Sequence, residues 1–538
     1  MTDVTIEEVS AQTGARPRLD NPSGLGTFVL FMGLLGGGLL YTAYSIYVDI
    51  DETGVHTTSL LPYLLLFVAL VIALGFEFVN GFHDTANAVA TVIYTNALPA
   101  PVAVVWAGVF NFLGVMASAG AVAFGIISLL PVELILQVGS SAGFAMVFAL
   151  LVAAILWNLG TWYLGLPASS SHTLIGSIIG VGVANAMLHG LDGTSGVDWG
   201  KAKEIGQSLL FSPVIGFFVA ALLLIAVKFL IKNPALYREP EANQPPPWWI
   251  RLTLIGTCTA VSFAHGSNDG QKGMGLIMLI LIGTVPTAYA LNRALPDSQA
   301  IEFQKTSAAA AAVIDKKAWG LSIPGGVPRE AVQTYVAHRK ITGATYPALA
   351  GLVREIAREV TEYGSLKKVP AEQVGNTRND MYLASEALRF LAKDKANELS
   401  AEDLTTLNTY KKSLDSATKF IPLWVKIAVA IALGLGTMIG WKRIVVTVGE
   451  KIGKSHMTYA QGASAEIVAA GMIAAADNFG LPVSTTHVLS SGVAGTMTAA
   501  GAGLQGSTVR NMLMAWVLTL PASIMLSASL YVLFTNLF

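Results

Sequence analysis

The amino-acid sequence predicts an all-α polytopic membrane protein with two inverted repeats, broken or re-entrant helices and a soluble helical insertion. Three observations predict this fold. Of the 538 residues, 53% are hydrophobic and 12% are charged, whereas a soluble domain carries about 25% charged residues. Apolar runs of about 20 residues, enough for a helix to cross a bilayer, recur along the chain. One pair of polar motifs occurs twice in the same order.

The apolar runs predict ten to twelve membrane spans. Ten runs lie near residues 25–47, 60–80, 101–128, 143–165, 169–189, 209–232, 421–440, 457–476, 484–503 and 510–536. Two more, near residues 250–264 and 274–296, are short or broken. Because the runs contain Gly, Ala, Ser and Pro and lack the alternation of lipid-facing strands, helices are favoured over a barrel.

The polar motifs and the charge pattern divide the chain. We expect a polar tail (1–24), an additional span and loop (25–59), a first repeat (60–233), and a second repeat (248–296 and 420–538) interrupted by a soluble helical insertion (297–419). The insertion holds roughly half of the 33 Lys and Arg residues and a similar number of acids, and we expect it on the cytoplasmic side. The basic loop at residues 441–454 lies only one apparent span away, which conflicts with a cytoplasmic position for both.

Each of the two motifs can be aligned with its copy in the other half, and the second match is the stronger one. Residues 81–87 (GFHDTAN) resemble residues 266–272 (GSNDGQK), with the glycine and the aspartate in register. Residues 165–174 (GLPASSSHTL) resemble residues 480–489 (GLPVSTTHVL). The loop at residues 130–143 has no Lys or Arg, whereas its counterpart at residues 441–454 is basic. This difference would follow if the two loops face opposite sides of the membrane. Inverted repeats of this kind are a recurring design in secondary transporters.

The Gly-Leu-Pro motif predicts a helix start inside the membrane. Proline is tolerated at the first helical position, and the hydroxyls that follow can cap the first turn. Such a start presents free backbone N–H groups and the positive end of the helix dipole, to which Ser169, Ser170, Ser484 and Thr485 add hydroxyl donors. The motif therefore suits an oxyanion, unless the hydroxyls only bond back to their own helix.

Two aspartates lie in the other motif. Asp84 and Asp269 are ionisable groups in apolar surroundings, which mark substrate or proton pathways. Carboxylates suit an anion site if the anion itself carries protons, as phosphate does near neutral pH, because P–OH can donate to a carboxylate. Sulfate and nitrate offer no such donor. A carboxylate could instead hold a coupling cation or proton, and the sequence leaves both roles open.

Other ionisable groups accompany the aspartates. Asn87 and Lys272 each follow an aspartate by three residues and share its face if the segment is helical, although Lys272 could simply neutralise Asp269. Four of the eight histidines lie in the motifs, without the spacing of a zinc site. We expect His172 and His487 to orient neighbours and His83 or His265 to relay protons. The further acids Glu77, Glu466 and Asp477 are candidates for the coupling path.

On these motifs, and on residues 78–94, 157–176 and 264–283, the chain resembles the inorganic phosphate transporter (PiT) family and its bacterial low-affinity branch. The resemblance implies an all-helical carrier that imports inorganic phosphate across the inner membrane by cation symport. By matching position, the implied phosphate site comprises Asp84, Asn87, Ser169, Ser170, Asn268, Asp269, Ser484 and Thr485. The commoner family motifs have Asn at the positions of His83 and Lys272. We therefore expect proton coupling, with sodium or a co-transported metal–phosphate complex as alternatives.

No cofactor and no resident metal are expected. The expected partners are inorganic phosphate and the lipid bilayer, with a homodimer as an open alternative and no nucleic acid. Three rival functions remain: a carrier of another oxyanion such as sulfate, a phosphate sensor that does not transport, and an intramembrane hydrolase. Adjacent Ser171 and His172 point about 100° apart on a helix, which makes them a poor nucleophile and base pair.

Overall fold

The computed structural model describes residues 19, 25–54, 61–84, 86–130, 132–136, 138–190, 192, 196–241, 244–296, 298–318, 327–394 and 399–537. Over these residues the chain is α-helical, with short 3-10 turns and one isolated β-bridge between Gly453 and Leu504. The prediction of an all-α fold is confirmed. Except for Leu19, the expected polar tail (1–24) lies outside the described residues.

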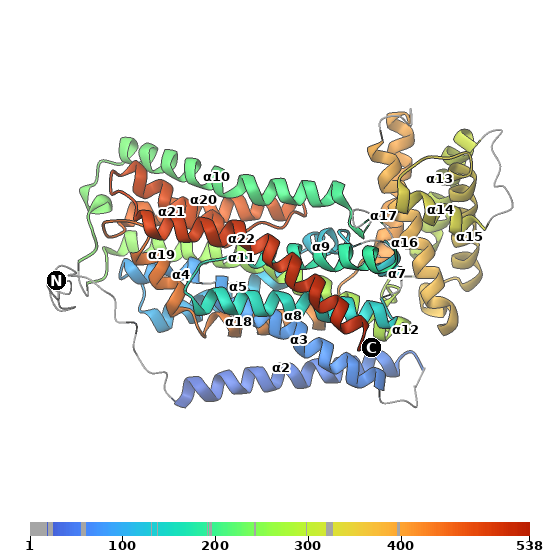
Figure 1. The fold of residues 1–538 in the computed structure, drawn as a ribbon, viewed down its shortest axis with the longest axis horizontal. Helices are drawn as coiled ribbons and strands as arrows, with labels where there is room; N and C mark the ends of the chain where they lie inside the picture. The colour runs from blue at the N-terminus through green and yellow to red at the C-terminus, as the bar shows by residue number, and fades with distance from the viewer. Residues whose placement is uncertain are drawn as a thin grey trace.

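Long helices run side by side along the longest axis, and shorter helices cluster at one end (Figure 1). The first part of the chain forms α2 (Leu25–Asp51), α3 (Leu61–Asp84), α4 (Ala86–Tyr94), α5 (Ala100–Ala117), α6 (Ala121–Ile127), α7 (Val132–Leu136), α8 (Ser141–Tyr163), α9 (Ser170–Leu188) and α10 (Trp199–Leu230). The second part forms α11 (Trp248–Thr284), α12 (Pro286–Tyr289), α18 (Leu423–Thr437), α19 (Lys442–Glu450), α20 (Tyr459–Asn478), α21 (Thr485–Ala499) and α22 (Gly506–Thr535). Between them lie α13 (Ser298–Ala318), α14 (Pro328–His338), α15 (Thr345–Tyr363), α16 (Ala371–Lys393) and α17 (Ala401–Thr418).

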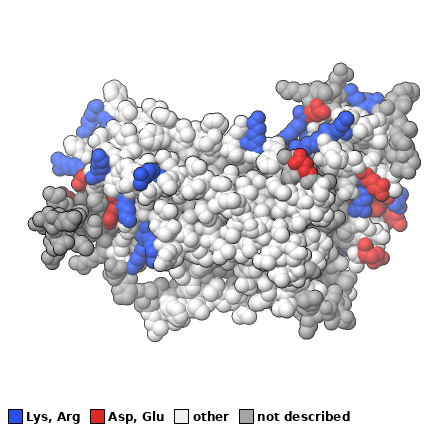
Figure 2. Space-filling view, viewed as in Figure 1, with Lys and Arg blue, Asp and Glu red and all other residues white. Residues whose placement is uncertain are grey.

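The apolar helices make this a multi-pass membrane protein. Within the described residues, seven helices are long and apolar enough to cross a bilayer, or eight if the bent pair α17 and α18 counts as one span. This is fewer than the ten to twelve spans that hydropathy predicts. Charged side chains gather at the two ends of the molecule, and the visible face between them is almost free of charge (Figure 2).

Part of one expectation is wrong. Hydropathy predicts two short or broken runs near 250–264 and 274–296, but the first run and the start of the second belong to one helix of 37 residues, α11, and the second run is interrupted at Val285, before α12. Its polar stretch lowers hydropathy without breaking the helix, because buried side chains there find partners on a neighbouring helix or one turn away on α11 itself. Gln271 donates to Asp477, for example, and Lys272 pairs with Asp269 one turn earlier.

The two parts pack on each other in reciprocal pairs. Helix α3 packs on α18 and α11 packs on α5, while α9 packs on α22 and α10 on α21. The two motif glycines lie at these crossings. A Cβ on Gly81 would lie 2.3 Å from the carbonyl oxygen of Leu433, and one on Gly266 would lie 2.1 Å from that of Asn111. Each crossing therefore requires a residue without a side chain.

Helices α13 to α17 form the insertion, at the opposite end of the molecule from α19 (Figure 1). Helix α18 lies between them in the chain, and the insertion and the basic segment at 441–454 lie at opposite ends of the molecule. Within the insertion, apolar residues of α15 and α16 are buried, as the helical spacing of their apolar residues predicts. A cytoplasmic insertion would place the basic segment on the outer side.

A buried aspartate docks the insertion on the membrane part. Asp198, the N-cap of α10, lies 2.8 Å from Arg339 Nη2 and 3.1 Å from Arg389 Nη2. Arg389 also lies 2.6 Å from Glu386 on α16. Burial alone would raise the pKa of the Asp198 carboxyl, but the backbone N–H of Lys201 and the two arginines lower that pKa below its ordinary value. This contribution to docking is therefore present above the ordinary pKa of an aspartate and is lost as the pH falls through the lowered value.

We expect Asp198→Asn to loosen the insertion. Removing one partner of a buried ion pair costs about 3 kcal/mol or more. Hydrogen–deuterium exchange should therefore speed up in α16, and the melting temperature should fall. The matched control is Asp315→Asn, which breaks an exposed pair with Arg354 that is worth at most about 1 kcal/mol. Equal exchange in the two variants would contradict this role of Asp198.

Candidate functional site

Two helix starts of identical construction lie inside the protein. Gly165 and Gly480 adopt φ values of 67° and 64°, a left-handed conformation that favours glycine. Helices α9 and α21 then begin, with Ser169 and Ser484 as their N-caps. Each cap oxygen accepts a hydrogen bond from the backbone N–H three residues later, at 3.2 Å and 3.1 Å. These two hydroxyl oxygens thus bond back to their own helices.

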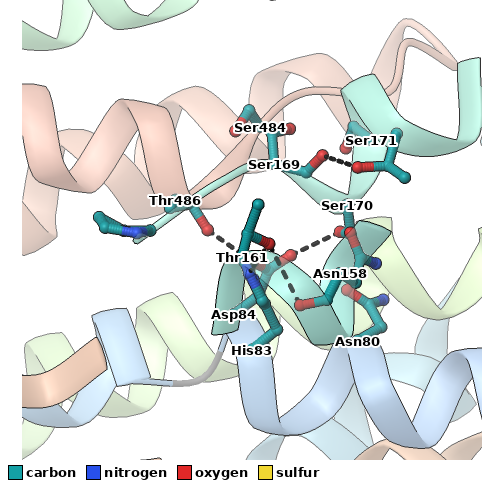
Figure 3. A network of polar contacts seen from close by, with 12 residues as sticks. Asn80, His83, Asp84, Asn158, Thr161, Ser169, Ser170, Ser171, Ser484 and Thr486 are labelled. Atoms are coloured by element: carbon teal, nitrogen blue, oxygen red, sulfur yellow. Dashed lines mark hydrogen bonds and ion pairs between the residues drawn. The ribbon is translucent and has the colours of Figure 1, made fainter. Parts of the chain in front are cut away.

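Asp84 joins three elements of the site. It ends α3, is 3% exposed, and accepts hydrogen bonds from Ser170 Oγ at 2.5 Å and Thr486 Oγ1 at 2.6 Å (Figure 3). One hydroxyl comes from each copy of the Gly-Leu-Pro motif. His83 Nδ1 lies 3.0 Å from the same carboxylate, and its Nε2 lies 3.2 Å from Thr161 Oγ1. The sequence therefore brings hydroxyls from both halves to one carboxylate.

Asp269 has a different set of neighbours. On α11, Lys272 Nζ lies 2.7 Å from Asp269 Oδ2, and both side chains are fully buried. His265 Nε2 lies 3.4 Å from the same oxygen, and His265 Nδ1 lies 2.9 Å from Asn111 Oδ1. The ion pair spans one helical turn, as the three-residue spacing predicts.

The two aspartates share one site. Ligand atoms of Asp84, Asp269 and His265 all lie within 4.8 Å of one another, and all three residues are buried. Two carboxylates and an imidazole at this separation could hold a proton or a hard cation. The sequence predicts no resident metal, and the structure adds that donors for a cation converge here.

Several buried atoms of the site lack hydrogen-bond partners among the described residues. They include Asn268 Oδ1, Asp269 Oδ1 and Thr485 Oγ1. Buried polar atoms nearly always have partners, so these atoms indicate a polar occupant. Two of the three are acceptors, and the third is a hydroxyl that can donate. The set therefore fits a ligand that both donates and accepts hydrogen bonds.

The remaining candidate residues fall into separate places. Glu77 is fully buried against α11, where a Cβ on Gly273 would lie 2.5 Å from its Oε1. Asp477 is half-buried and accepts from Ser267 Oγ and Gln271 Nε2, both at 2.6 Å. It therefore braces α11 against α20. The side chain of Asn87 lies outside the described part of the chain.

Glu466 lies apart from the two aspartates. It is fully buried on α20, and its Oε2 accepts a hydrogen bond from Thr257 on α11. Thr257 precedes Asp269 by twelve residues, about 18 Å along a helix. Among the described residues, Glu466 Oε1 has no partner.

His172 and His487 pack against each other. Their ring centroids lie 4.6 Å apart with the rings tilted by 38°, and His487 stacks on Trp516 at 4.1 Å. Trp516 Nε1 in turn donates to the carbonyl of Pro167. The two histidines therefore connect the two helix starts.

Sequence reasoning missed several members of the network. Thr486 stands in the quoted motif, but only the folded chain shows that this hydroxyl reaches Asp84. Asn111 bonds to His265 and donates to Thr437 Oγ1 at 3.1 Å. Gln271 links the backbone N–H of Val122 to Asp477. The available signal was the presence of side-chain amides within apolar runs.

A multi-pass helical protein with buried carboxylates and a lysine between two packed halves is typical of a secondary transporter. The chain belongs to the phosphate transporter family, whose model matches residues 80–527. It is therefore a transporter and not an enzyme.

Named relatives cover most of the chain. The low-affinity inorganic phosphate transporter PitA of Escherichia coli (strain K12) is 44% identical over 487 residues, which cover 87% of this chain and 96% of that protein. PitB from the same strain is 42% identical over 488 residues, with the same coverage. A probable low-affinity inorganic phosphate transporter of Bacillus subtilis is 28% identical over 477 residues, or 88% of this chain and 99% of that one. A solved structure described as "The sodium-dependent phosphate transporter" aligns with a TM-score of 0.48 and 20% identity, covering 88% of this chain and 100% of that one.

Proposed function

We propose that this chain imports inorganic phosphate with low affinity across the inner (plasma) membrane by proton symport, with two inverted repeats alternating around the site. The names of its relatives support phosphate as the substrate. The convergence of Asp84 and Asp269 at one buried site, next to the starts of α9 and α21, is the observation that carries the mechanism.

Phosphate fits the unpartnered atoms of the site. Its P–OH can donate to Asp269 Oδ1 or Asn268 Oδ1, and its bare oxygens can accept from Lys272 and Thr485. Sulfate carries no proton near neutral pH and would leave the two acceptors without a donor. An excess of sulfate should therefore fail to compete with phosphate uptake, and strong competition would favour a general oxyanion carrier.

The charges favour a cation as co-substrate. Asp84, Asp269 and Lys272 together carry a formal charge of −1 when ionised, and the buried Glu77 adds another acid. A phosphate anion enters such a site at lower cost if protons or another cation neutralise the carboxylates. Lys272 stands where the commoner family motif has an amide. Its ammonium group therefore lies beside Asp269, where a bound sodium ion would otherwise neutralise the carboxylate. We therefore favour protons over sodium.

A metal–phosphate complex is the alternative cargo. Asp84, Asp269 and His265 offer the oxygen and nitrogen atoms that would accompany a divalent cation carried with phosphate. Such a metal would be part of the substrate. Uptake that requires a divalent cation, at constant phosphate and pH, would favour this alternative.

Imposed gradients test the coupling. Purified protein in liposomes should accumulate labelled phosphate when the lumen is alkaline and sodium is absent. An inward sodium gradient without a pH gradient should give only background uptake. Full accumulation from the sodium gradient alone would overturn proton coupling while leaving phosphate transport intact.

We expect Glu466→Gln to separate coupling from substrate binding. Glu466 is a buried acid with one unpartnered oxygen and lies outside the phosphate site, so a role in proton transfer is the proposal. The variant should lose about 100-fold or more of pH-driven accumulation, the effect of one lost proton-transfer group, while exchange of labelled for unlabelled phosphate at equal pH persists. The matched control is Glu362→Gln, which alters an exposed pair on the insertion. Loss of exchange together with accumulation would place Glu466 in substrate binding instead.

A further inference from the structure

An apolar groove lies between the outermost helices α10 and α22. It has a volume of about 680 Å³ and is open on one side, with walls that include Leu209, Leu210, Phe217, Leu513, Val517 and Leu520. We call it the α10–α22 groove. Its lining runs along α10 from Ala202 to Phe218, which is about 24 Å of helix. In a membrane protein a groove of this kind faces hydrocarbon and not water.

The floor of the groove carries polar atoms that are not satisfied. His172 Nδ1, His487 Nε2 and Ser490 Oγ are buried and have no hydrogen-bond partner among the described residues, and all three side chains line the groove. His487 is 2% exposed and Ser490 is 1% exposed. An occupant of the groove is therefore mostly apolar but carries at least one polar group that can bond to these atoms.

Cationic side chains flank one mouth of the groove. The lining residues at this end are Ile452, Leu504 and Val509. Their neighbours in the sequence include Lys451, Lys454 and Arg510, all exposed. The Lys454 side chain lies over Gly503, where a Cβ would be 3.2 Å from its Cδ. Lys and Arg side chains predominate at this end of the molecule (Figure 2).

Two acids near these cations are already engaged. Glu239 Oε1 accepts a hydrogen bond from the backbone N–H of His456, two residues after Lys454. Glu450 precedes Lys451, and its Oε1 accepts a hydrogen bond from Tyr94 at 2.7 Å. The mouth is therefore basic, and the groove behind it is apolar with a few hydrogen-bonding atoms. These features match a phospholipid: the basic mouth suits its phosphate, the hydrogen-bonding atoms suit its ester carbonyls, and the apolar walls suit an acyl chain.

We propose that the α10–α22 groove binds one anionic phospholipid of the bilayer, with its phosphate on Lys451, Lys454 and Arg510 and one acyl chain along α10. An ester carbonyl accepts hydrogen bonds from Ser490 and His487. Because His172 and His487 lie in the first turns of α9 and α21, the lipid packs against the helix starts that carry Ser170 and Thr486. Phosphate uptake is therefore sensitive to lipid composition at a site distinct from the substrate site.

Two different variants test the site in the full-length protein. The triple variant Lys451→Gln, Lys454→Gln and Arg510→Gln removes the cationic mouth. Gly206→Phe fills the groove without changing charge. A side chain fits at this position because Gly206 lines the groove and a Cβ there meets open space. The matched control is Lys228→Gln with Lys232→Gln, two basic residues near the end of α10 that do not line the groove.

The probe is phosphatidylglycerol, followed by native mass spectrometry of the purified protein and by uptake in phosphatidylcholine liposomes with and without it. Native protein and the control should retain one phosphatidylglycerol per chain and show faster uptake when it is present. The triple variant and Gly206→Phe should each lose at least tenfold in lipid retention and should not respond to the lipid. Displacement of the retained lipid by millimolar inorganic phosphate would assign the mouth to the free anion and overturn the proposal.

Three other outcomes would also overturn it. The first is retention that is equal in the native protein and in both variants. The second is the absence of any retained lipid from the native protein. The third is a cross-link between cysteines placed at Leu513 in two copies, which would show that a second chain fills the groove.

Discussion

Asp84→Asn should lower phosphate uptake by about 100-fold or more. The carboxylate accepts hydrogen bonds from Ser170 and Thr486 and lies beside His83, so three elements depend on its two oxygens. An amide offers one accepting oxygen and one NH₂ group. The hydroxyl that faces the NH₂ group could no longer donate and would have to accept instead. A loss of about 3 kcal/mol for charge-assisted bonds corresponds to roughly 100-fold. The measurement is labelled phosphate uptake by purified protein in liposomes.

The control for Asp84→Asn is another aspartate that accepts two hydrogen bonds. Asp49 on α2 accepts from Tyr289 Oη at 2.8 Å and from Trp424 Nε1 at 3.0 Å, away from the site. Asp49→Asn should destabilise the protein to a similar degree and leave uptake per folded molecule unchanged. If Asp84→Asn transports as well as Asp49→Asn, Asp84 does not belong to the phosphate site.

Lys272→Met should both destabilise the protein and abolish accumulation. It leaves the Asp269 carboxylate buried without its cation, and breaking a buried pair in this way costs about 3–5 kcal/mol. The double variant Asp269→Asn with Lys272→Met removes both charges and should recover much of that stability. It should still fail to accumulate phosphate, because the substrate has lost the ammonium and the carboxylate together.

The two measurements on these variants are independent. Thermal unfolding in detergent reports stability, and uptake in liposomes reports transport. If the double variant transports at the native rate, Lys272 and Asp269 only neutralise each other and neither contacts the substrate. If Lys272→Met is as stable as the native protein, the 2.7 Å contact contributes little.

Local chemistry made part of the site predictable. The Pro-x-Ser spacing placed Ser169 and Ser484 at helix starts, and the three-residue spacing placed Lys272 beside Asp269. These are contacts within one helix or one turn, where spacing fixes geometry. The same reasoning identified both aspartates, since charge in an apolar run is costly wherever the chain folds.

Contacts between distant segments could not be predicted in the same way. Thr486 lies 402 positions from Asp84 in sequence, and no spacing rule links them. Hydropathy also failed for α11, because the average over a window drops at polar residues whether or not they are paired inside the fold. The inverted relation of the halves, the coupling ion and the roles of the site residues stay predictions.

The motif glycines have a consequence for the site as a whole. Gly81 and Gly266 precede Asp84 and Asp269 by three residues, so each aspartate lies one helical turn beyond a point where backbone touches backbone. A methyl group at either point would force the two helices apart and carry the neighbouring carboxylate with them. The two helix crossings therefore fix how closely the helices that carry the aspartates approach their neighbours. Because the main chains touch there, the two hydrogen atoms that stand in place of side chains set the separation of Asp84 and Asp269.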